Sequence, residues 1–205
     1  MSTSSPAMHA RFAPDRALDD AALVRTAQAG KHDAILLVWD RYASLVRGVL
    51  RRSLGPQGDV EDLVQEVFIG FHRNVGNLRD PSALSGFLVS IASRLAISEI
   101  RKRKVRSFLR LTDDGELPER AAVSDDGPEA LGRLYALLDT CSATDRMAFV
   151  LRYIEGLELE EVASALGVSL ATAKRRIAGV NARIVTLAKK DPLLSAYVIE
   201  EPVPS

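Results

Sequence analysis

The residues best suited to bind nucleic acid lie close together near the C-terminal end, where Lys174, Arg175 and Arg176 follow Ser169 and Thr172. Lysine and arginine donate hydrogen bonds to phosphate oxygens, and arginine can bind the edge of a guanine through two hydrogen bonds at once. If the segment is helical, these five residues lie within about two turns of one another. They form a candidate DNA-binding surface.

A helix, a tight turn and a second helix are predicted to position this surface. The acidic run 158–161 suits a first helical turn, where negative charge complements the helix dipole. Gly167 stands where that helix would end, and Ser169 is a suitable N-cap for the next one. The second helix has a predicted buried face of apolar residues at spacings of three and four: Ala173, Ile177, Val180, Ile184 and Leu187.

This arrangement is a helix-turn-helix, which places the N-terminal residues of its second helix in the major groove of DNA. The alternative is an ordinary helical hairpin whose basic face is only solvated.

Composition narrows the remaining choices. The chain has 205 residues, of which 47% are hydrophobic, enough for one or two domains with real cores. A single cysteine, Cys141, excludes an internal disulfide and fits a reducing cytoplasm, so we expect it to be a small apolar filler. We find no apolar run long enough to span a bilayer and no signal peptide at residues 1–14, which predicts a cytoplasmic protein without stable membrane insertion.

The charges sum to zero, with 27 basic and 27 acidic residues, but they are segregated along the chain. A basic cluster at residues 94–110 gives way to an acidic stretch at residues 111–128, which contains Gly and Pro and lacks a helical period. We therefore predict an all-α fold of two small helical domains joined by a flexible acidic linker. The expected parts are a disordered N-terminus (1–17), a first domain (18–107), the linker (108–128), a helix-turn-helix domain (129–190) and a tail (191–205).

Residues 59–74 are predicted to form an amphipathic helix. Its buried stripe comprises Val60, Leu63, Val64, Val67, Phe68 and Phe71. The opposite face is acidic with an apolar residue in it: Glu61, Asp62, Gln65, Glu66 and Ile69. A solvated helix face is the alternative to a docking surface here.

Residues 87–106 are predicted to form a second long helix, with Phe87, Ile91 and Leu95 on its core side. Its C-terminal part and the residues just after it carry a dense set of basic residues: Arg94, Arg101, Lys102, Arg103, Lys104, Arg106 and Arg110. The helix dipole favours cations at this end, but the cluster exceeds what capping requires. A phosphate backbone is the expected partner.

In combination, these segments resemble bacterial sigma factors of the extracytoplasmic-function (ECF) group, the RNA polymerase subunits that recognise promoters. The resemblance covers residues 18–189 and is most specific in EDLVQEVF, IASRLAISEIRKRK and LRYIEGLELEEVASALGVSLATAKRRI. It implies a protein that binds core RNA polymerase, recognises the −35 and −10 promoter elements and promotes DNA melting. It also implies that the protein is not itself an enzyme and needs no cofactor or metal.

The resemblance assigns roles to individual residues. Polymerase binding to the β′ clamp helices falls on Asp62, Val64, Gln65, Glu66 and Ile69, and the second domain is expected at the β flap. Recognition of the −10 element falls on Asn77 and Arg79 in the loop 74–85, followed by Ser90, Arg94, Arg101, Lys102, Arg103 and Lys104. Recognition of the −35 element falls on Ser169, Thr172, Lys174, Arg175 and Arg176.

Leu36 and Leu37 depart from the family pattern, which often has acidic residues at these positions. Either they pack against an extra element, such as the tail around residues 193–199, or they form a patch for a partner such as an anti-sigma factor.

The other functional classes explain fewer features. A helix-turn-helix regulator acting without polymerase docking would need a dimer, and it leaves the face at residues 61–69 without a role. An anti-sigma or adaptor protein has no need of two separate basic elements. An enzyme is disfavoured because Gly30-Lys31 lacks the flanking residues of a phosphate-binding loop and one cysteine cannot build a zinc site.

Overall fold

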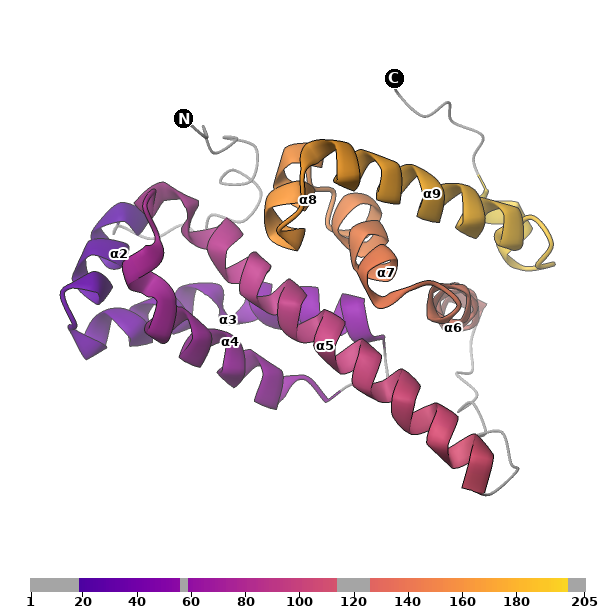
Figure 1. The fold of residues 1–205 in the computed structure, drawn as a ribbon, viewed down its shortest axis with the longest axis horizontal. Helices are drawn as coiled ribbons and strands as arrows, with labels where there is room; N and C mark the ends of the chain where they lie inside the picture. Colours follow the sequence, from indigo (N-terminus) through magenta and orange to yellow (C-terminus); the bar gives the residue numbers. More distant parts are fainter. Residues whose placement is uncertain (1–18, 56–58, 114–125, 199–205) are drawn as a thin grey trace.

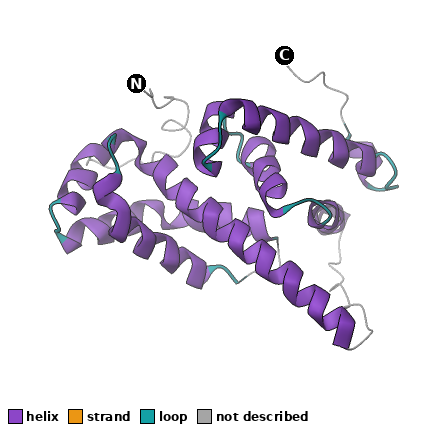
Figure 2. Ribbon diagram, viewed as in Figure 1, coloured by secondary structure: helices purple, strands orange, loops and turns teal. Residues whose placement is uncertain are grey.

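The computed structural model describes residues 19–55, 59–113 and 126–198, and these contain helices and turns but no strand (Figure 1, Figure 2). The first half comprises α2 (Asp20–Gln28), α3 (His32–Leu54), α4 (Glu61–Asn74) and α5 (Leu84–Asp113). Two 3₁₀ turns, Val75–Asn77 and Pro81–Ala83, connect α4 to α5. The predicted all-α class is confirmed.

The second half begins with α6 (Asp126–Asp139) and α7 (Ala143–Phe149), which continues as a π-helical turn, Val150–Ile154. The helix-turn-helix follows as α8 (Leu159–Leu166) and α9 (Leu170–Ala188), and a 3₁₀ turn (Leu194–Tyr197) closes the described chain. Gly167 ends α8 at φ 64°, a left-handed conformation that glycine adopts without a Cβ penalty. Ser169 caps α9 by accepting a hydrogen bond from the Thr172 amide, as predicted.

Both predicted buried stripes are present. On α4, Val64, Val67, Phe68 and Phe71 are buried. On α9, Ala173, Ile177, Val180 and Ile184 are buried, and Leu187 is half-buried. Helical spacing of apolar residues was therefore a reliable guide to which side of each helix faces the core.

The longest helix, α5, runs through the middle of the molecule (Figure 1). It packs against α3 and α4 on one side and against α7 and α8 on the other. The stretch Pro81–Leu109 is long and apolar enough to cross a membrane by length and composition alone, which corrects the expectation that no such run exists. Half of that apolar window is buried inside the protein, where Leu84, Leu88 and Ala92 are fully enclosed, so core packing accounts for its apolar character.

The helices extend into the segment that was predicted to be a linker. Because residues 108–113 contain neither Gly nor Pro, α5 continues to Asp113. At the other end α6 begins at Asp126, two residues before Pro128, and proline is tolerated in a first helical turn. The predicted linker is thus shortened at both ends. Residues 114–125, like the N-terminal residues 1–18, lie outside the described part of the chain.

The described part of the tail, residues 191–198, does not cover Leu36 and Leu37, so these residues are not the extra element that was expected there. Its 3₁₀ turn packs against α6, with Leu194 buried, and Asp191 pairs with Arg133 of α6 at 3.1 Å. Leu36 and Leu37, near the start of α3, are 64% and 44% exposed.

One hydrophobic core extends through both halves. Met147 and Leu151, at the α7 end, and Val162 of α8 belong to the same buried cluster as Leu50 of α3 and Leu88 of α5. A smaller cluster between α6, α7 and α9 includes Leu138, Cys141 and Phe149. Cys141 is a free, buried thiol, as expected of an apolar filler.

Polar side chains from the second half cap the C-terminal end of α3. The hydroxyl of Tyr135 donates to the Arg52 carbonyl at 2.9 Å, and the Arg146 guanidinium donates to the Ser53 carbonyl at 2.8 Å. Arg52 in turn forms a two-point ion pair with Glu155, at 2.6 and 2.9 Å. The last carbonyls of a helix have no partner within it, so these contacts complete α3 with groups from the other half.

Because the core is shared, we predict that the two halves unfold together. Met147→Ala should lower the free energy of unfolding by about 2–5 kcal/mol through the cavity it leaves. Trp39 is the only tryptophan and lies in α3, so its fluorescence reports the first half, whereas circular dichroism reports all helices. Both signals should shift to the same lower urea midpoint.

Leu131→Ala is the matched control, because Leu131 is also in the second half but is 46% exposed. It should leave both midpoints nearly unchanged. A Met147→Ala protein whose Trp39 transition stayed at the parental midpoint would contradict the shared core.

Candidate polymerase and nucleic-acid interfaces

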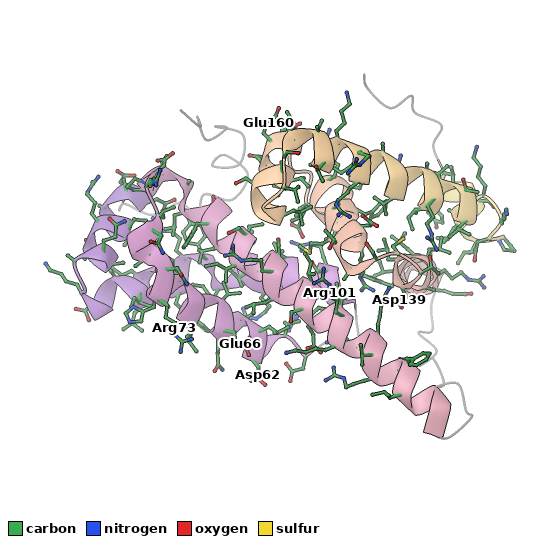
Figure 3. The ribbon with its side chains drawn as sticks, in the orientation of Figure 1. Asp62, Glu66, Arg73, Arg101, Asp139 and Glu160 are labelled. Atoms are coloured by element: carbon green, nitrogen blue, oxygen red, sulfur yellow. The ribbon has the colours of Figure 1, made fainter. Side chains whose placement is uncertain are left out.

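The outer face of α4 presents the predicted acidic patch to solvent. Asp62, Gln65 and Glu66 are exposed, and Ile69 is 48% exposed beside them. Asp62 and Glu66 project from the same side of α4, away from the second half (Figure 3). We call the four residues Asp62, Gln65, Glu66 and Ile69 the α4 face.

Val64 is not part of the α4 face, which corrects its assignment to polymerase binding. Its side chain is completely buried, because it occupies the core side of the same helix. Glu61 is not part of the α4 face either, because it is paired with Arg47 of α3, which donates two hydrogen bonds to it at 2.8 and 2.9 Å. The hydrogen bonding from Arg47 lowers the pKa of Glu61. This pair fixes the start of α4 against α3 and so sets the direction of the α4 face.

Gln28 of α2 fixes the loop between α4 and α5 through hydrogen bonds on the inner side of the loop. Its side-chain amide donates to the carbonyls of Val75 and Leu78, both at 3.0 Å. Asn77 and Arg79 remain exposed on the outside of this loop. Sequence reasoning missed Gln28, because its partners are 47 and 50 residues away and no local pattern links them.

The basic residues of α5 differ in their availability. Arg94 and Lys102 are exposed and form no ion pair within the part of the chain that the structure describes. Arg101 lies on the side of α5 toward the second half, with a guanidinium nitrogen 3.4 Å from the Thr144 hydroxyl (Figure 3). Ser90 is half-buried, and its hydroxyl donates to the Phe87 carbonyl at 2.8 Å.

Arg103 and Lys104 have partners within the protein. Arg103 donates to Glu99 at 3.0 Å, and Arg106 donates to the same carboxylate at 2.8 Å. Burial raises the pKa of Glu99, but the hydrogen bonds from the two arginines outweigh it, and the net pKa is lowered. Lys104 donates to the Cys141 carbonyl in the second half.

On α9, the three basic residues also differ in exposure and in hydrogen bonding. Lys174 and Arg175 are exposed at the start of the helix. Arg176 is half-buried and donates to Asp145 of α7 at 2.8 Å, and its buried Nε has no hydrogen-bond partner. Asp145 also accepts a hydrogen bond from Ser142 at 2.6 Å. Arg176 therefore connects the second helix of the motif to α7.

Ser169 and Thr172 are close to each other, with their hydroxyl oxygens 2.9 Å apart. Ser169 is the N-cap of α9 and accepts a hydrogen bond from the Thr172 amide, so both residues position its first turn whether or not they also contact a base. No group of three His, Cys, Asp or Glu side chains among the described residues is placed to hold a metal ion.

The fold and these surfaces define a class of protein: a helical DNA-binding protein with a helix-turn-helix, a separate basic helix and an acidic docking face. Family models agree, matching "Sigma-70 region 2" at residues 38–106 and "Sigma-70, region 4" at residues 131–178.

Individual relatives point the same way. The ECF RNA polymerase sigma factor SigE of Mycolicibacterium smegmatis is 35% identical over 150 residues, which is 68% of this chain and 57% of that protein. SigX of Bacillus subtilis, also an ECF sigma factor, is 30% identical over 140 residues, which is 63% of this chain and 71% of that protein.

A solved structure is also similar: the sigma factor RpoE in complex with the anti-sigma factor NepR from Bartonella quintana. It has 25% identity and a TM-score of 0.55, covering 78% of this chain and 96% of that one. The chain belongs to the ECF RNA polymerase sigma factors. This membership supports the predicted function, a subunit that binds RNA polymerase and recognises promoters.

Arg175 is exposed, whereas Arg176 is paired with Asp145, so we expect substitutions of the two residues to affect −35 recognition differently. Arg175→Ala should change the relative initiation from −35 variants by roughly 5- to 150-fold, the range of one lost two-point contact to a base. Arg176→Ala should instead weaken initiation on all −35 variants alike, because Arg176 holds α9 against α7. The assay is transcription by the reconstituted holoenzyme on a panel of −35 mutants.

Asp145→Asn provides the matched test, since it weakens the same ion pair from the α7 side. It should reproduce the uniform loss caused by Arg176→Ala. A change in −35 preference with Arg176→Ala that Asp145→Asn does not share would mean that Arg176 reads a base.

Proposed function

We propose that the chain docks on core RNA polymerase through the α4 face and reads promoter DNA with α5 and α9. This proposal is supported by three separate exposed surfaces on one helical protein. The first is the acidic α4 face with its apolar Ile69, the second is the basic side of α5, and the third is the basic start of α9. A regulator that acted without polymerase would have no use for the first of these.

The α4 face suits a protein partner. Ile69 offers apolar area to bury, and the surrounding Asp62, Gln65 and Glu66 offer charge and hydrogen-bond complementarity. The proposed partner is the pair of β′ clamp helices. For the second half, the proposed contact is the β flap, which would place α9 near the −35 element.

The loop after α4 and the exposed side of α5 suit the −10 element. Asn77 and Arg79 are exposed on a loop that Gln28 keeps in shape, which favours capture of an unstacked base. Arg94, Arg101 and Lys102 are the proposed phosphate contacts on α5. Arg103 and Lys104 are weaker candidates, because Glu99 and the Cys141 carbonyl already accept hydrogen bonds from them.

The arrangement in this structure cannot read both promoter elements at once. By their numbering, the −35 and −10 elements lie about 25 base pairs apart, roughly 85 Å along B-form DNA at about 3.4 Å per base pair. Packed helices have axes about 8–10 Å apart. Since α8 packs against both α5 and α9, the start of α9 lies within roughly 20 Å of α5. We infer that the two halves separate when the chain binds polymerase and DNA.

The chemistry of RNA synthesis is assigned to the polymerase, so the chain itself is proposed to have no enzymatic activity and to work in the cytoplasm. An anti-sigma factor is a further proposed partner, because the similar structure of RpoE was solved in complex with one.

Charge reversal on α4 tests the docking surface. Asp62→Lys with Glu66→Lys should weaken binding to core polymerase at least tenfold and reduce run-off transcription from a promoter library, because like charge would face the partner. Both residues are exposed, so the helical content should be unchanged. Asp40→Lys, an exposed charge reversal on α3 outside both proposed polymerase contacts, is the control and should bind normally. Equal binding by the α4 variant and the parent would refute the docking assignment.

Opening can be followed with two labels, at Ser44→Cys in α3 and Ser164→Cys in α8, in a Cys141→Ala background. Both serines are exposed. The distance between the labels should be short and uniform in the free chain and should increase when core polymerase is added. Arg52→Ala, which leaves the buried Glu155 carboxylate unpaired, should broaden the distances without polymerase. An unchanged distance in the holoenzyme would show that the closed form is the active one.

A further inference from the structure

The connection between α4 and α5 begins with a short segment in which buried apolar residues alternate with exposed polar ones. Val75 and Leu78 are buried, at 4% and 9% exposed, whereas Asn77 and Arg79 are exposed. The exposed side chains are therefore carried by a backbone that is anchored on both sides of Asn77. We call residues 75–79 the reading loop.

The backbone of the reading loop is braced by one side chain from another helix. Gln28, the last residue of α2, donates from its amide nitrogen to the carbonyls of Val75 and Leu78, both at 3.0 Å. These two hydrogen bonds use both hydrogens of the amide. Helix α2 lies beside the connection and packs against both of its 3₁₀ turns (Figure 1).

Local contacts hold the chain just before and just after the reading loop. The Asn74 side chain donates to the Gly70 carbonyl at 2.8 Å, and the Asp80 carboxylate accepts from the Ser82 amide at 3.0 Å. Between these two points, the loop carbonyls accept hydrogen bonds from Gln28. The brace from α2 thus acts on the part of the connection that carries the exposed residues.

We propose that Gln28 is a positioning residue that sets the selectivity of the chain among −10 sequences. The inference rests on the proposed function, in which Asn77 and Arg79 meet an unstacked base of the −10 element. By joining carbonyls on both sides of Asn77, Gln28 fixes the curvature of the reading loop before DNA arrives. A loop held in one shape accepts a matching base without an ordering cost and does not reshape itself around a different base.

The contacts of Gln28 require a primary amide. Two carbonyl acceptors need two N–H donors on one nitrogen and no acceptor facing them. Glutamate has the same shape but turns an oxygen towards both carbonyls, and methionine has a similar length but donates nothing. Gln28→Met and Gln28→Glu therefore form a graded series. Because Gln28 is exposed overall, neither substitution opens a cavity.

The attachment of α2 to the protein does not depend on Gln28. At the other end of α2, Arg41 and Tyr42 of α3 both donate to the Asp20 carboxylate, and Val24 in its middle is fully buried. A residue that merely attached α2 would, when lost, reduce initiation on every promoter alike. A residue that positions the reading loop affects the choice among −10 sequences, and this difference decides the test.

The first measurement uses the free full-length chain and needs no polymerase. Amide hydrogen exchange should be faster in the reading loop of Gln28→Met than in the parent, and faster still in Gln28→Glu, because the loop opens more readily without its brace. Peptides from α9 should exchange at the parental rate. Unchanged exchange in the reading loop of both variants would overturn the proposal.

The second measurement is run-off transcription with core polymerase on a panel of −10 variants and a panel of −35 variants. The preference of the parent for its best −10 sequence over single-base variants should fall at least ~5-fold in Gln28→Met and Gln28→Glu, since two hydrogen bonds are lost. The preference among −35 variants should stay at the parental level. Equal losses across both panels would show a structural role and overturn the proposal.

Ala29→Glu is the matched control for charge. It adds a carboxylate at the next residue, which is also exposed, and leaves the amide of Gln28 in place. It should keep the parental −10 preference. The same loss with Ala29→Glu as with Gln28→Glu would point to repulsion of DNA by the added charge and overturn the proposal. A parent that initiates from no promoter refutes the proposed function, whereas variants that discriminate among −10 sequences as well as an active parent refute this inference alone.

Discussion

The capping of α3 by the second half is the constraint on which the arrangement of this protein depends. Helix α3 ends with carbonyls that lack partners of their own, and the Tyr135 hydroxyl and the buried Arg146 guanidinium supply hydrogen bonds to two of them. Beside them, the Glu155 carboxylate is only 3% exposed and is neutralised by Arg52. A buried ion pair adds little net stability, but losing one partner is costly, so these contacts specify one docked geometry rather than a strong attachment.

That geometry also determines which basic residues are available to DNA. Lys104 is drawn to the Cys141 carbonyl and Arg101 to Thr144, because the turn between α6 and α7 lies against α5. Arg94 and Lys102, on α5, and Arg175, on α9, keep their charges exposed. If the halves separate, Lys104 and Arg101 lose these contacts, so more positive charge on α5 becomes available to DNA. The same movement takes α9 away from α5.

Local signals in the sequence were sufficient for α4, α5 and the helix-turn-helix, and for the buried sides of α4 and α9. Gly167 and Ser169 predicted the turn between α8 and α9, and the period of Val64, Val67 and Phe71 predicted the core side of α4. The same period should have excluded Val64 from the docking surface. What could not be predicted were contacts between distant residues: Arg52 and Glu155 are 103 positions apart, and Arg146 and Ser53 are 93 apart. Such pairs leave no local pattern, so neither the closed arrangement nor the structural role of Arg176 was visible.

The shared core links polymerase affinity to the packing between the halves. On the proposed separation, Met147, Leu151 and Val162 would lose the part of their burial that the first half supplies, and full burial of an apolar side chain of this size contributes about 1.5–3 kcal/mol. In that case polymerase contacts would have to exceed this cost, because apparent affinity falls in proportion to the fraction of molecules that are binding-competent. Substitutions that weaken the interface between the halves should therefore raise the affinity for core polymerase, while those in the α4 face lower it. A closed resting state requires that substitutions between the halves and substitutions in the α4 face change the affinity for core polymerase in opposite directions. A sigma factor that was always open would not show this difference.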